Sequence, residues 1–515
     1  MLDRRPALEI SFHYYVQYRI AIQGELTMRT SPYSDAPAQS RDCWPREQMT
    51  QDREQKDQRV LLPARLSSLR KGMRCSFDSP PSSGMTRRTF LALALGATAG
   101  ALSGCAVNPV TGQSQLMLMS REQEIQVDKE RSPHQFSADY GVIQDQRLNS
   151  YISQTGKRII DITHRPDMPY SFQGVNAAYV NAYAFPGGSI AVTRGILVEM
   201  EDEAELAALL GHELGHVNAR HTAQQMTKGV FVSALLTGAG IALSGNEEYA
   251  PLVSGLGGIG AGLLLAKYSR DNERQADDLG MEYMVNAGYS PQGMINLQEM
   301  LLSLSSRQPS ALETMFSTHP MSRERLATAR QTARSKYGQA MQKPVYKERY
   351  MDHTAGLRKI KPAIKAMQEG EKHMAKQDYQ AAESSLNQAL RTAPRDYAAL
   401  VMMSKCLLAQ DRPQEAERYA KQAEEVYPQE AQAKYFQGVA DIGQQDYESA
   451  LQSFSAYDRL LPGNPMVNFL QGLSLEGMGR KESAASRYRQ FLSQVNKGKQ
   501  AQYAYNRLKE WGYIH

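Results

Sequence analysis

The carboxy-terminal part of this 515-residue chain repeats itself every 34 residues. Small residues, prolines and large apolar residues all recur in register with one another. The sets are Ala382, Ala416, Ala450 and Ala484; Gly370, Ser404, Gly438 and Gly472; Pro394, Pro428 and Pro462; and Leu386, Phe454 and Tyr488. Small residues allow two helices to pack closely, and proline ends a helix because it cannot continue the hydrogen-bond ladder. The period therefore predicts stacked pairs of helices.

This period resembles that of the tetratricopeptide repeat, a helix–turn–helix unit of 34 residues. Four units would span residues 363–496, and a helix around residues 500–511 would cap the last unit. We therefore expect an α-solenoid over residues 361–515, whose concave surface recruits other proteins.

A His-Glu-x-x-His motif lies further upstream, on a segment that is predicted to be helical. Asp202 and Glu205 have the spacing of a capping box, and leucines at helical spacing follow them. Residues four apart lie on one face of a helix, so His212 and His216 present two imidazoles to one point. A catalytic zinc ion can take such a pair as two of its three protein ligands, and Glu213, next to the metal, can take a proton from the attacking water.

Two histidines leave a catalytic zinc ion one protein ligand short. Further along the chain, Glu273 and Asp277 are four apart and share a helix face. The first carboxylate can bind the metal, and the second can hold the other N–H of a ligand histidine. Charged helix faces often contain such pairs, so the carboxylate pair is informative only together with His-Glu-x-x-His. The alternative interpretation of the His-Glu-x-x-His segment itself is an exposed helix with two incidental histidines.

Residues 211–221 (G-H-E-L-G-H-V-N-A-R-H) and residues 273–277 (E-R-Q-A-D) together resemble the M48 zinc metallopeptidases. The resemblance implies a mainly α chain in which an α+β, gluzincin-like zincin domain holds one zinc ion. It also implies a role for each motif residue: zinc ligation by His212, His216 and Glu273, general base catalysis by Glu213, and support of the ligands by Asp277.

Thr318-His319-Pro320 and the following Arg325 are similar to a segment of the bacterial periplasmic branch of that family. The resemblance implies that His319 can reach the zinc from a loop as a switch ligand and hold a resting state. It also puts Arg325 close to the site, where either residue can stabilise the oxyanion. The alternative for His319 is a loop histidine that caps a helix. We expect His221 to be structural, because five residues past His216 it points away from the metal face.

The region around residue 100 has the pattern of an export signal. Residues 85–104 combine a basic start with a short apolar stretch and lead into Leu-Ser-Gly-Cys, which resembles a lipobox. We expect a lipoprotein signal peptide, of either the twin-arginine or the Sec type, with lipid on Cys105. Ala106 at the next position favours the outer membrane, facing the periplasm. Residues 1–84 are then a mis-assigned or disordered leader.

The net charge of +5 belongs to these amino-terminal segments. Residues 1–104 hold 15 of the 59 basic and 10 of the 54 acidic residues, so the remainder is balanced. A balanced chain gives no reason to propose a nucleic-acid partner. Cys406 is the one cysteine beyond Cys105, which excludes a disulfide framework within the mature chain, and we expect it to be a small core residue.

We expect residues 105–345 to form the metalloprotease domain, with a linker near residues 340–360. Strand-like alternation over residues 177–192, with a Pro-Gly-Gly turn, predicts a hairpin whose edge, near residues 183–192, pairs with extended substrates. Two apolar stretches within residues 228–268 are each too short to span a bilayer comfortably. A packed helical hairpin is the simplest interpretation, and a membrane-dipping or gating hairpin is the alternative.

These features together predict a lipid-anchored, periplasm-facing zinc endopeptidase. Its expected substrates are misfolded or stalled outer-membrane proteins, and its repeats would recruit substrates or the outer-membrane assembly machinery. A lipid-anchored chaperone or scaffold with a mostly closed zinc site is one alternative. An integral membrane peptidase is another, and it requires residues 228–268 to cross the bilayer.

Overall fold

The structure is a computed structural model that describes three stretches of the chain, residues 105–228, 268–307 and 313–514. The expected leader (residues 1–84), the expected signal peptide (residues 85–104) and nearly all of the apolar segment 228–268 lie outside the described residues. Within the described stretches, no helix combines the length and the hydropathy that a membrane span requires.

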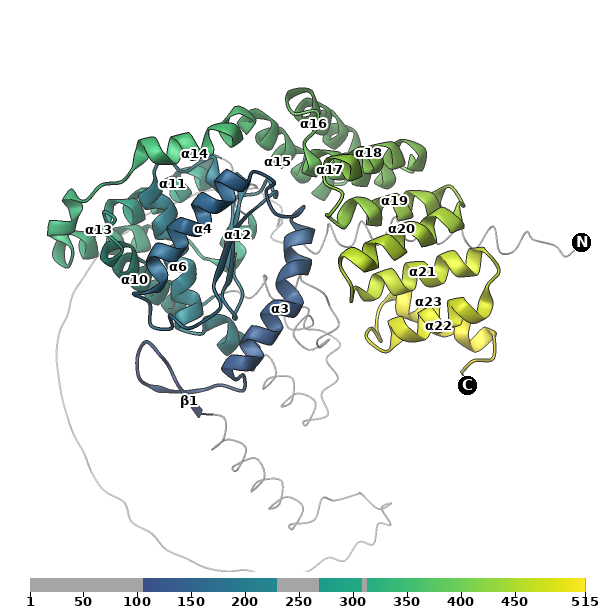
Figure 1. Cartoon of the computed structure of the whole chain (residues 1–515), viewed down its shortest axis with the longest axis horizontal. Helices are drawn as coiled ribbons and strands as arrows, with labels where there is room; N and C mark the ends of the chain where they lie inside the picture. Colours follow the sequence, from purple (N-terminus) through teal and green to yellow (C-terminus); the bar gives the residue numbers. More distant parts are fainter. Residues whose placement is uncertain (1–104, 229–267, 308–312, 515) are drawn as a thin grey trace, which may run out of the picture. The chain divides into compact units, whose positions relative to one another are not determined.

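The described residues ahead of Pro344 form short strands and helices of very different length. In chain order they are β1 (Cys105–Val107), β2 (Ser114–Leu116), α3 (Arg121–Ala138), α4 (Gln146–Ile160), β3 (Ser171–Val175), β4 (Ala182–Ala184), β5 (Ser189–Thr193), α5 (Arg194–Leu197), α6 (Glu203–Asn218), α10 (Arg270–Asn286), α11 (Gln292–Arg307), α12 (Glu313–Thr318), α13 (Arg323–Ser335) and the 3-10 helix η3 (Gly338–Gln342). Figure 1 shows them in blue to green.

The described chain beyond Pro344 contains helices and no strands. These helices are α14 (Lys347–Lys359), α15 (Lys361–Ala375), α16 (Tyr379–Thr392), α17 (Tyr397–Ala409), α18 (Pro413–Val426), α19 (Gln432–Gly443), α20 (Tyr447–Leu460), α21 (Pro465–Gly477), α22 (Lys481–Leu492) and α23 (Lys499–Glu510). The predicted fold class, an α+β domain followed by helical repeats, is confirmed.

The main sheet has the strand order β3-β5-β4. β3 and β5 run parallel, with Ser171 opposite Ser189, whereas β4 and β5 form an antiparallel hairpin with Ala182 opposite Val192. Gly188 in the turn has φ +108, a conformation that glycine adopts readily. The hairpin is thus present as predicted. The expected substrate edge is wrong for β5, because this strand lies in the middle of the sheet, and of the two hairpin strands only β4 is at an edge.

Helix α6 carries the His-Glu-x-x-His motif and is buried along its whole length. It packs against α4, α10, α11 and β4. Its amino terminus is capped as the sequence predicts, since the Asp202 carboxylate accepts a hydrogen bond from the Glu205 N–H at 2.9 Å. The reciprocal half of the capping box is shifted, because the Glu205 carboxylate accepts from the N–H of Glu201 instead. A helix made mostly of Ala, Leu and Gly can be enclosed in this way because it presents few polar groups.

The backbones of α6 and α10 touch through glycine. A Cβ atom added to Gly211 would lie 2.8 Å from the Gly280 carbonyl oxygen, and one added to Gly280 would lie 2.7 Å from the His212 nitrogen. One turn along, a Cβ on Gly215 would lie 3.0 Å from the Cα of Ala276. Side chains of ordinary size would separate the two helices. The glycines therefore bring the histidine face of α6 against the first turns of α10.

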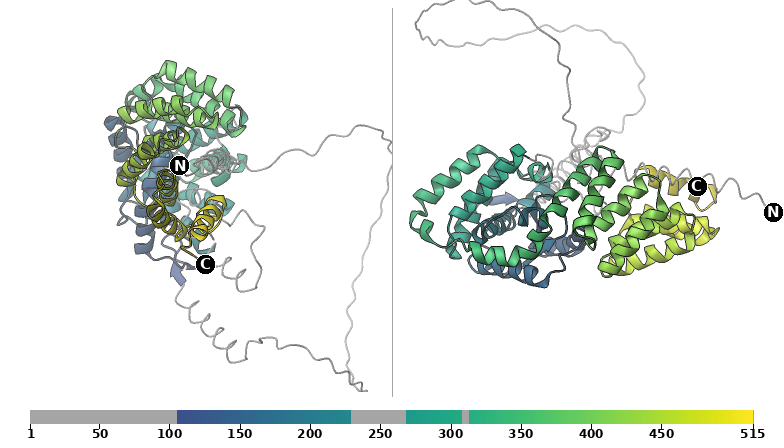
Figure 2. Two further views of the ribbon diagram at one scale, coloured as in Figure 1. Left: turned by 90° about the vertical axis from the view of Figure 1, so that its right-hand side faces the viewer. Right: turned by 90° about the horizontal axis from the view of Figure 1, so that it is seen from above.

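The repeats use glycine differently. Helices α15 to α22 pack as consecutive pairs that stack on one another, followed by α23, as Figure 1 shows in green to yellow and Figure 2 shows from two other sides. In three of the pairs, a Cβ added to the first helix would approach a large side chain of the second: Gly370 approaches Leu386 (3.1 Å), Gly438 approaches Phe454 (2.8 Å) and Gly472 approaches Tyr488 (2.6 Å). In the remaining pair both positions are small, Ser404 and Ala420. Cys406 is buried nearby, as expected.

The predicted linker at residues 340–360 is wrong for most of its length, because it contains helix α14. The break is confined to the residues around Pro344 and ends at Tyr346, which has φ +56. Helix α14 is packed rather than free, since the Tyr350 hydroxyl is buried and donates a hydrogen bond to the Leu197 carbonyl at 2.6 Å. An amphipathic helix thus follows directly on the break.

Candidate metal centre

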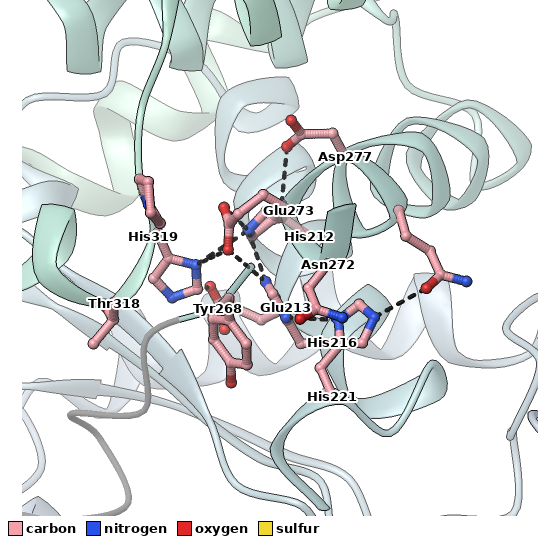
Figure 3. Close-up of polar contacts among 12 residues, drawn as sticks. His212, Glu213, His216, His221, Tyr268, Asn272, Glu273, Asp277, Thr318 and His319 are labelled. Carbon is pink, nitrogen blue, oxygen red and sulfur yellow. Dashed lines mark hydrogen bonds and ion pairs between the residues drawn. The ribbon is translucent and has the colours of Figure 1, made fainter. Parts of the chain in front are cut away.

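Four buried side chains with metal-binding atoms meet beside helix α6. His212 and His216 come from α6, Glu273 comes from the first turn of α10, and His319 follows the end of α12. One donor atom from each residue lies within 4.8 Å of the others. Figure 3 shows these four side chains converging from three separate segments of the chain. The structure therefore brings together all four residues that the sequence analysis named as metal ligands.

The spacing of the donor atoms can be compared with that of a zinc site. His212 Nε2 lies 3.1 Å from His216 Nε2 and 3.4 Å from His319 Nδ1. Glu273 Oε1 lies 3.4 Å from His216 Nε2 and 3.0 Å from His319 Nδ1. A tetrahedral zinc with bonds of about 2.0–2.1 Å has ligand atoms about 3.3 Å apart. The four residues therefore fit zinc in both chemistry and spacing.

Glu213 lies beside this group without belonging to it. Its side chain is 1% exposed, and neither carboxylate oxygen has a hydrogen-bond partner among the described residues. The nearest ring nitrogen is Nε2 of His319, at 3.9 Å. Burial raises the pKa of Glu213, and the nearby His319 and His212 offset this only in part. A buried carboxylate without a partner is costly for folding, so its presence here indicates a chemical role.

The other ring nitrogen of His212 is held by a carboxylate. His212 Nδ1 lies 3.0 Å from Asp277 Oδ1, and Arg325 in turn binds both oxygens of Asp277 at 2.6 Å. Burial raises the pKa of Asp277, but the Arg325 guanidinium outweighs this effect and keeps the pKa below its usual value. A carboxylate partner of this kind orients a ligand histidine and increases its basicity.

Arg325 also reaches the ligand carboxylate. Its Nη1 lies 2.6 Å from Glu273 Oε2, so one guanidinium joins Glu273 to Asp277. Burial raises the pKa of Glu273, but the charge and hydrogen bond of His319 and the hydrogen bond of His216 hold it well below the usual range. The pKa of His319 is lowered by burial and raised more strongly by Glu273 and Glu213, with a net rise. The site therefore favours an ionised Glu273.

Tyr268 is a contact residue that the sequence analysis missed. Its ring stacks on His216, with centroids 3.9 Å apart, and its hydroxyl is 2.9 Å from that of Thr222. Its N–H donates to the Thr318 carbonyl at 3.0 Å, directly before His319. An aromatic residue five positions ahead of Glu273 carries no signal in the sequence, because only the folded chain brings it to the histidines.

His221 also lies closer to the site than expected. Its ring is fully buried, and its Nδ1 is 3.0 Å from Nδ1 of His216. Burial lowers the pKa of His221 to about 4. The expectation that His221 points away from the metal face is therefore incomplete, since the residue contacts a ligand from behind.

Two histidines from a His-Glu-x-x-His helix, a glutamate from a second helix and a free carboxylate define the site of a gluzincin-type metallopeptidase. The comparisons with known proteins agree with this class. The family model described as "Peptidase family M48" matches residues 146–333, and a tetratricopeptide repeat model matches residues 373–439. The chain belongs to peptidase family M48.

Named relatives support the same assignment. The beta-barrel assembly-enhancing protease of Yersinia pestis is 31% identical over 246 residues, 46% of this chain and 49% of that protein. The Escherichia coli (strain K12) protein of the same name is 30% identical over 238 residues, 44% of this chain and 47% of that protein. Metalloprotease YcaL of the same strain is 33% identical over 186 residues, 35% of this chain and 70% of that protein. The chain thus matches about half the length of the first two relatives.

Proposed function

We propose that this protein is a zinc-dependent endopeptidase with one zinc ion per chain, bound by His212, His216 and Glu273. The observation that carries this proposal is the buried set of donor atoms with the unpartnered Glu213 carboxylate beside it. A zinc ion at this position would polarise the scissile carbonyl group and lower the pKa of the attacking water to about 7.

The other residues of the site have supporting roles in this proposal. Glu213 takes the proton of the attacking water and delivers it to the leaving amine. Asp277 orients His212, and Arg325 holds Asp277 and Glu273 in place. A direct role of Arg325 or His319 at the oxyanion requires a rearrangement, because both side chains are engaged with carboxylates here.

His319 is proposed to be a switch ligand. Its Nδ1 would be the fourth donor atom, beside those of His212, His216 and Glu273. A zinc ion with four protein ligands has no free position for substrate. The described arrangement then corresponds to a resting state. His319 must leave before a peptide can bind.

The cellular part of the proposal follows from the sequence motifs and the relatives. Residues 105–345 would be the protease domain and residues 361–515 the repeat domain, exported by the signal at residues 85–104 without the leader 1–84. Lipid on Cys105 would anchor the protein to the outer membrane, facing the periplasm. The relatives named as beta-barrel assembly-enhancing proteases suggest misfolded or stalled outer-membrane proteins as substrates. The repeats would recruit these substrates or the outer-membrane assembly machinery.

One observation favours a second function, that of a chaperone or scaffold. His319 lies within hydrogen-bond distance of Glu273, a contact that would keep the site closed in this proposal. A protein whose active site rarely opens would act mainly through its repeats. The two functions differ in whether the Glu213 carboxylate is needed.

The test compares the purified wild-type protein with its Glu213→Gln and His319→Ala variants. Zinc content is measured together with cleavage of casein and of an unfolded outer-membrane protein. We expect one zinc per chain in all three proteins, faster cleavage by His319→Ala, and a loss of about 100-fold or more in Glu213→Gln, because general base catalysis contributes at least that factor. Absence of zinc from the wild-type protein would contradict the proposal.

A cellular assay separates the two functions. The Glu213→Gln gene is introduced into cells that lack the wild-type gene, and envelope integrity is measured. Failure to restore integrity supports the peptidase. Full restoration by a variant that retains zinc but cannot cleave would instead establish the scaffold.

A further inference from the structure

We infer that His221 and Gln275 form a hydrogen-bond relay that keeps the proton of His216 on Nδ1. The lone pair of His216 Nε2 is then free to bind the metal. This inference rests on the proposed zinc site and assigns two further positioning residues to it. The contacts are His216 Nδ1 to His221 Nδ1 at 3.0 Å and His221 Nε2 to Gln275 Oε1 at 3.0 Å. Figure 3 shows His221 beside His216, on the side away from His319.

The direction of the relay follows from the hydrogen-bonding capacity of its last member. An amide oxygen only accepts, so Gln275 Oε1 requires the proton of His221 to be on Nε2. Nδ1 of a neutral His221 is then an acceptor, and His216 must donate from its own Nδ1. This leaves Nε2 of His216 unprotonated, and Nε2 is the atom that faces His212 and Glu273.

Reversal of the amide would reverse the whole relay. If the Gln275 NH₂ group faced His221, it would donate to Nε2, and His221 would donate from Nδ1 to His216. His216 would then carry its proton on Nε2, where it cannot bind a metal. An amide can be turned over with little change in shape, so its hydrogen bonds decide which form is present. Only the described orientation of Gln275 is compatible with zinc at this site.

The fold places His221 behind His216 by ending helix α6 early. The helix ends at Asn218, and Arg220 has φ +61, the left-handed conformation that reverses a chain at a helix end. Arg220 is held there by Glu124, which accepts from its Nε at 2.8 Å. An uninterrupted helix would carry residue 221 away from His216, whereas this turn returns it.

The two ligand histidines are therefore supported in different ways. His212 has an anionic partner, Asp277, whereas His216 has a neutral one, the ring of His221. The acidic residues Glu273 and Asp277 already share one buried cation, Arg325. A neutral relay fixes the second histidine without a further buried negative charge.

The test uses Gln275, because this side chain is partly exposed and its replacement should leave the fold intact. Gln275→Leu removes the hydrogen-bond acceptor, whereas Gln275→Glu keeps a carboxylate oxygen, which can accept a hydrogen bond but cannot donate one. Zinc affinity of the purified full chain is measured by competition with a chromogenic chelator, and thermal unfolding of the zinc-free proteins is recorded in parallel. We expect a loss of zinc affinity of about 10- to 100-fold in Gln275→Leu, and an affinity equal to wild type or tighter in Gln275→Glu.

Each contrary outcome has a separate meaning. Equal zinc affinity of wild type and Gln275→Leu would overturn the relay while the proposed zinc site stands. An equal loss in both variants would also overturn it, because the acceptor would then be irrelevant. A loss of thermal stability in Gln275→Leu without a loss of affinity would reduce the pair to a structural role. A wild-type protein that binds no zinc would overturn the proposed function itself.

Discussion

Both regions of the molecule use glycine to bring two helices together, but they do so over very different distances along the chain. In the repeats, Gly370 faces Leu386, sixteen residues later, and the arrangement recurs at Gly438 and Gly472. Between α6 and α10, Gly211 faces Gly280 across a long stretch of intervening chain, and backbone meets backbone. A larger residue at a glycine of the repeats can be accommodated within one repeat, because the opposing side chain can move. A larger residue between α6 and α10 would have to move a whole backbone segment.

The two regions also differ in how they treat buried charge. At the candidate metal centre, Arg325 is paired with both Asp277 and Glu273. In the repeats, the carboxylate of the buried Asp441 accepts a hydrogen bond from the Ser453 hydroxyl at 3.1 Å, and the nearby cation, Lys421, is exposed. The positions one period before and after Asp441 are leucines. The acidic residues at the metal centre thus share a cation, whereas Asp441 takes a position that is apolar in the neighbouring repeats.

The largest expected effect compares two arginines. Arg325→Met leaves the buried Glu273 and the largely buried Asp277 without their cation, so we expect the free energy of unfolding to fall by about 3–5 kcal/mol. The control is Arg480→Met, because Arg480 and Glu448 form an exposed pair with atoms 3.9 Å apart, and it should cost less than about 1 kcal/mol. Chemical denaturation of the purified proteins measures both. Similar losses of unfolding free energy in the two variants would mean that the buried arginine of the metal centre is worth no more than the exposed arginine of the repeats.

The second prediction compares two glycines. In Gly280→Ala the new methyl group meets the backbone nitrogen of His212, so we expect a loss of about 2–3 kcal/mol and weaker zinc binding as the helices separate. In Gly370→Ala the methyl group meets the flexible side chain of Leu386 at 3.1 Å, and the gain in helix propensity of about 1 kcal/mol offsets the contact. Denaturation and chelator competition on both variants provide the measurement. Retention of full zinc affinity in Gly280→Ala would show that the close approach is not needed for the site.

The third prediction concerns pH. Burial raises the pKa of Asp441 to about 7 in the folded protein, and nearby Glu417 and Asp446 add to this while Lys421 opposes it. The folded state then holds a proton that the unfolded state has released, so this residue makes stability fall as the pH rises from about 4 to 7. We expect Asp441→Leu to be more stable than wild type at pH 8, by about 1 kcal/mol, and to show little gain at pH 4.

Thermal unfolding at the two pH values checks this prediction, with Asp441→Asn as a second variant that keeps the shape of the side chain. A gain of the same size at both pH values would assign the effect to packing rather than to charge.

The smallest expected effect tests the ring that lies against the metal centre. Tyr268→Phe removes the hydrogen bond to Thr222 but keeps the stacking on His216. We expect a loss of about 1 kcal/mol in the free energy of unfolding and unchanged zinc affinity. Denaturation and chelator competition measure the two quantities. A tenfold loss of zinc affinity would mean that the hydroxyl group, and not the ring, supports His216.

Much of the repeat region could be predicted from the sequence, because the contacts between its stacked helices join residues within one or two periods. The predicted linker failed for the complementary reason. Pro344 does interrupt the helical pattern, but a single break says nothing about the chain beyond it, where helix α14 follows. The expected substrate edge failed only for β5, since alternation along residues 177–192 identifies a hairpin and cannot say which of its strands lies in the middle of the sheet.

The candidate site divides in the same way. Spacing alone placed His212 beside His216 and Glu273 beside Asp277, because a helix converts a separation of four residues into a shared face. Their meeting with His319, the bridge made by Arg325 and the stacking of Tyr268 depend on how distant segments pack. His221 shows the limit most clearly, because one left-handed residue, Arg220, returns it to the back of His216, which an extrapolated helix would not show. The sequence by itself determined the periodic helices and the ligand pairs. Tertiary structure decided their convergence, because long-range packing leaves no periodic trace along the chain.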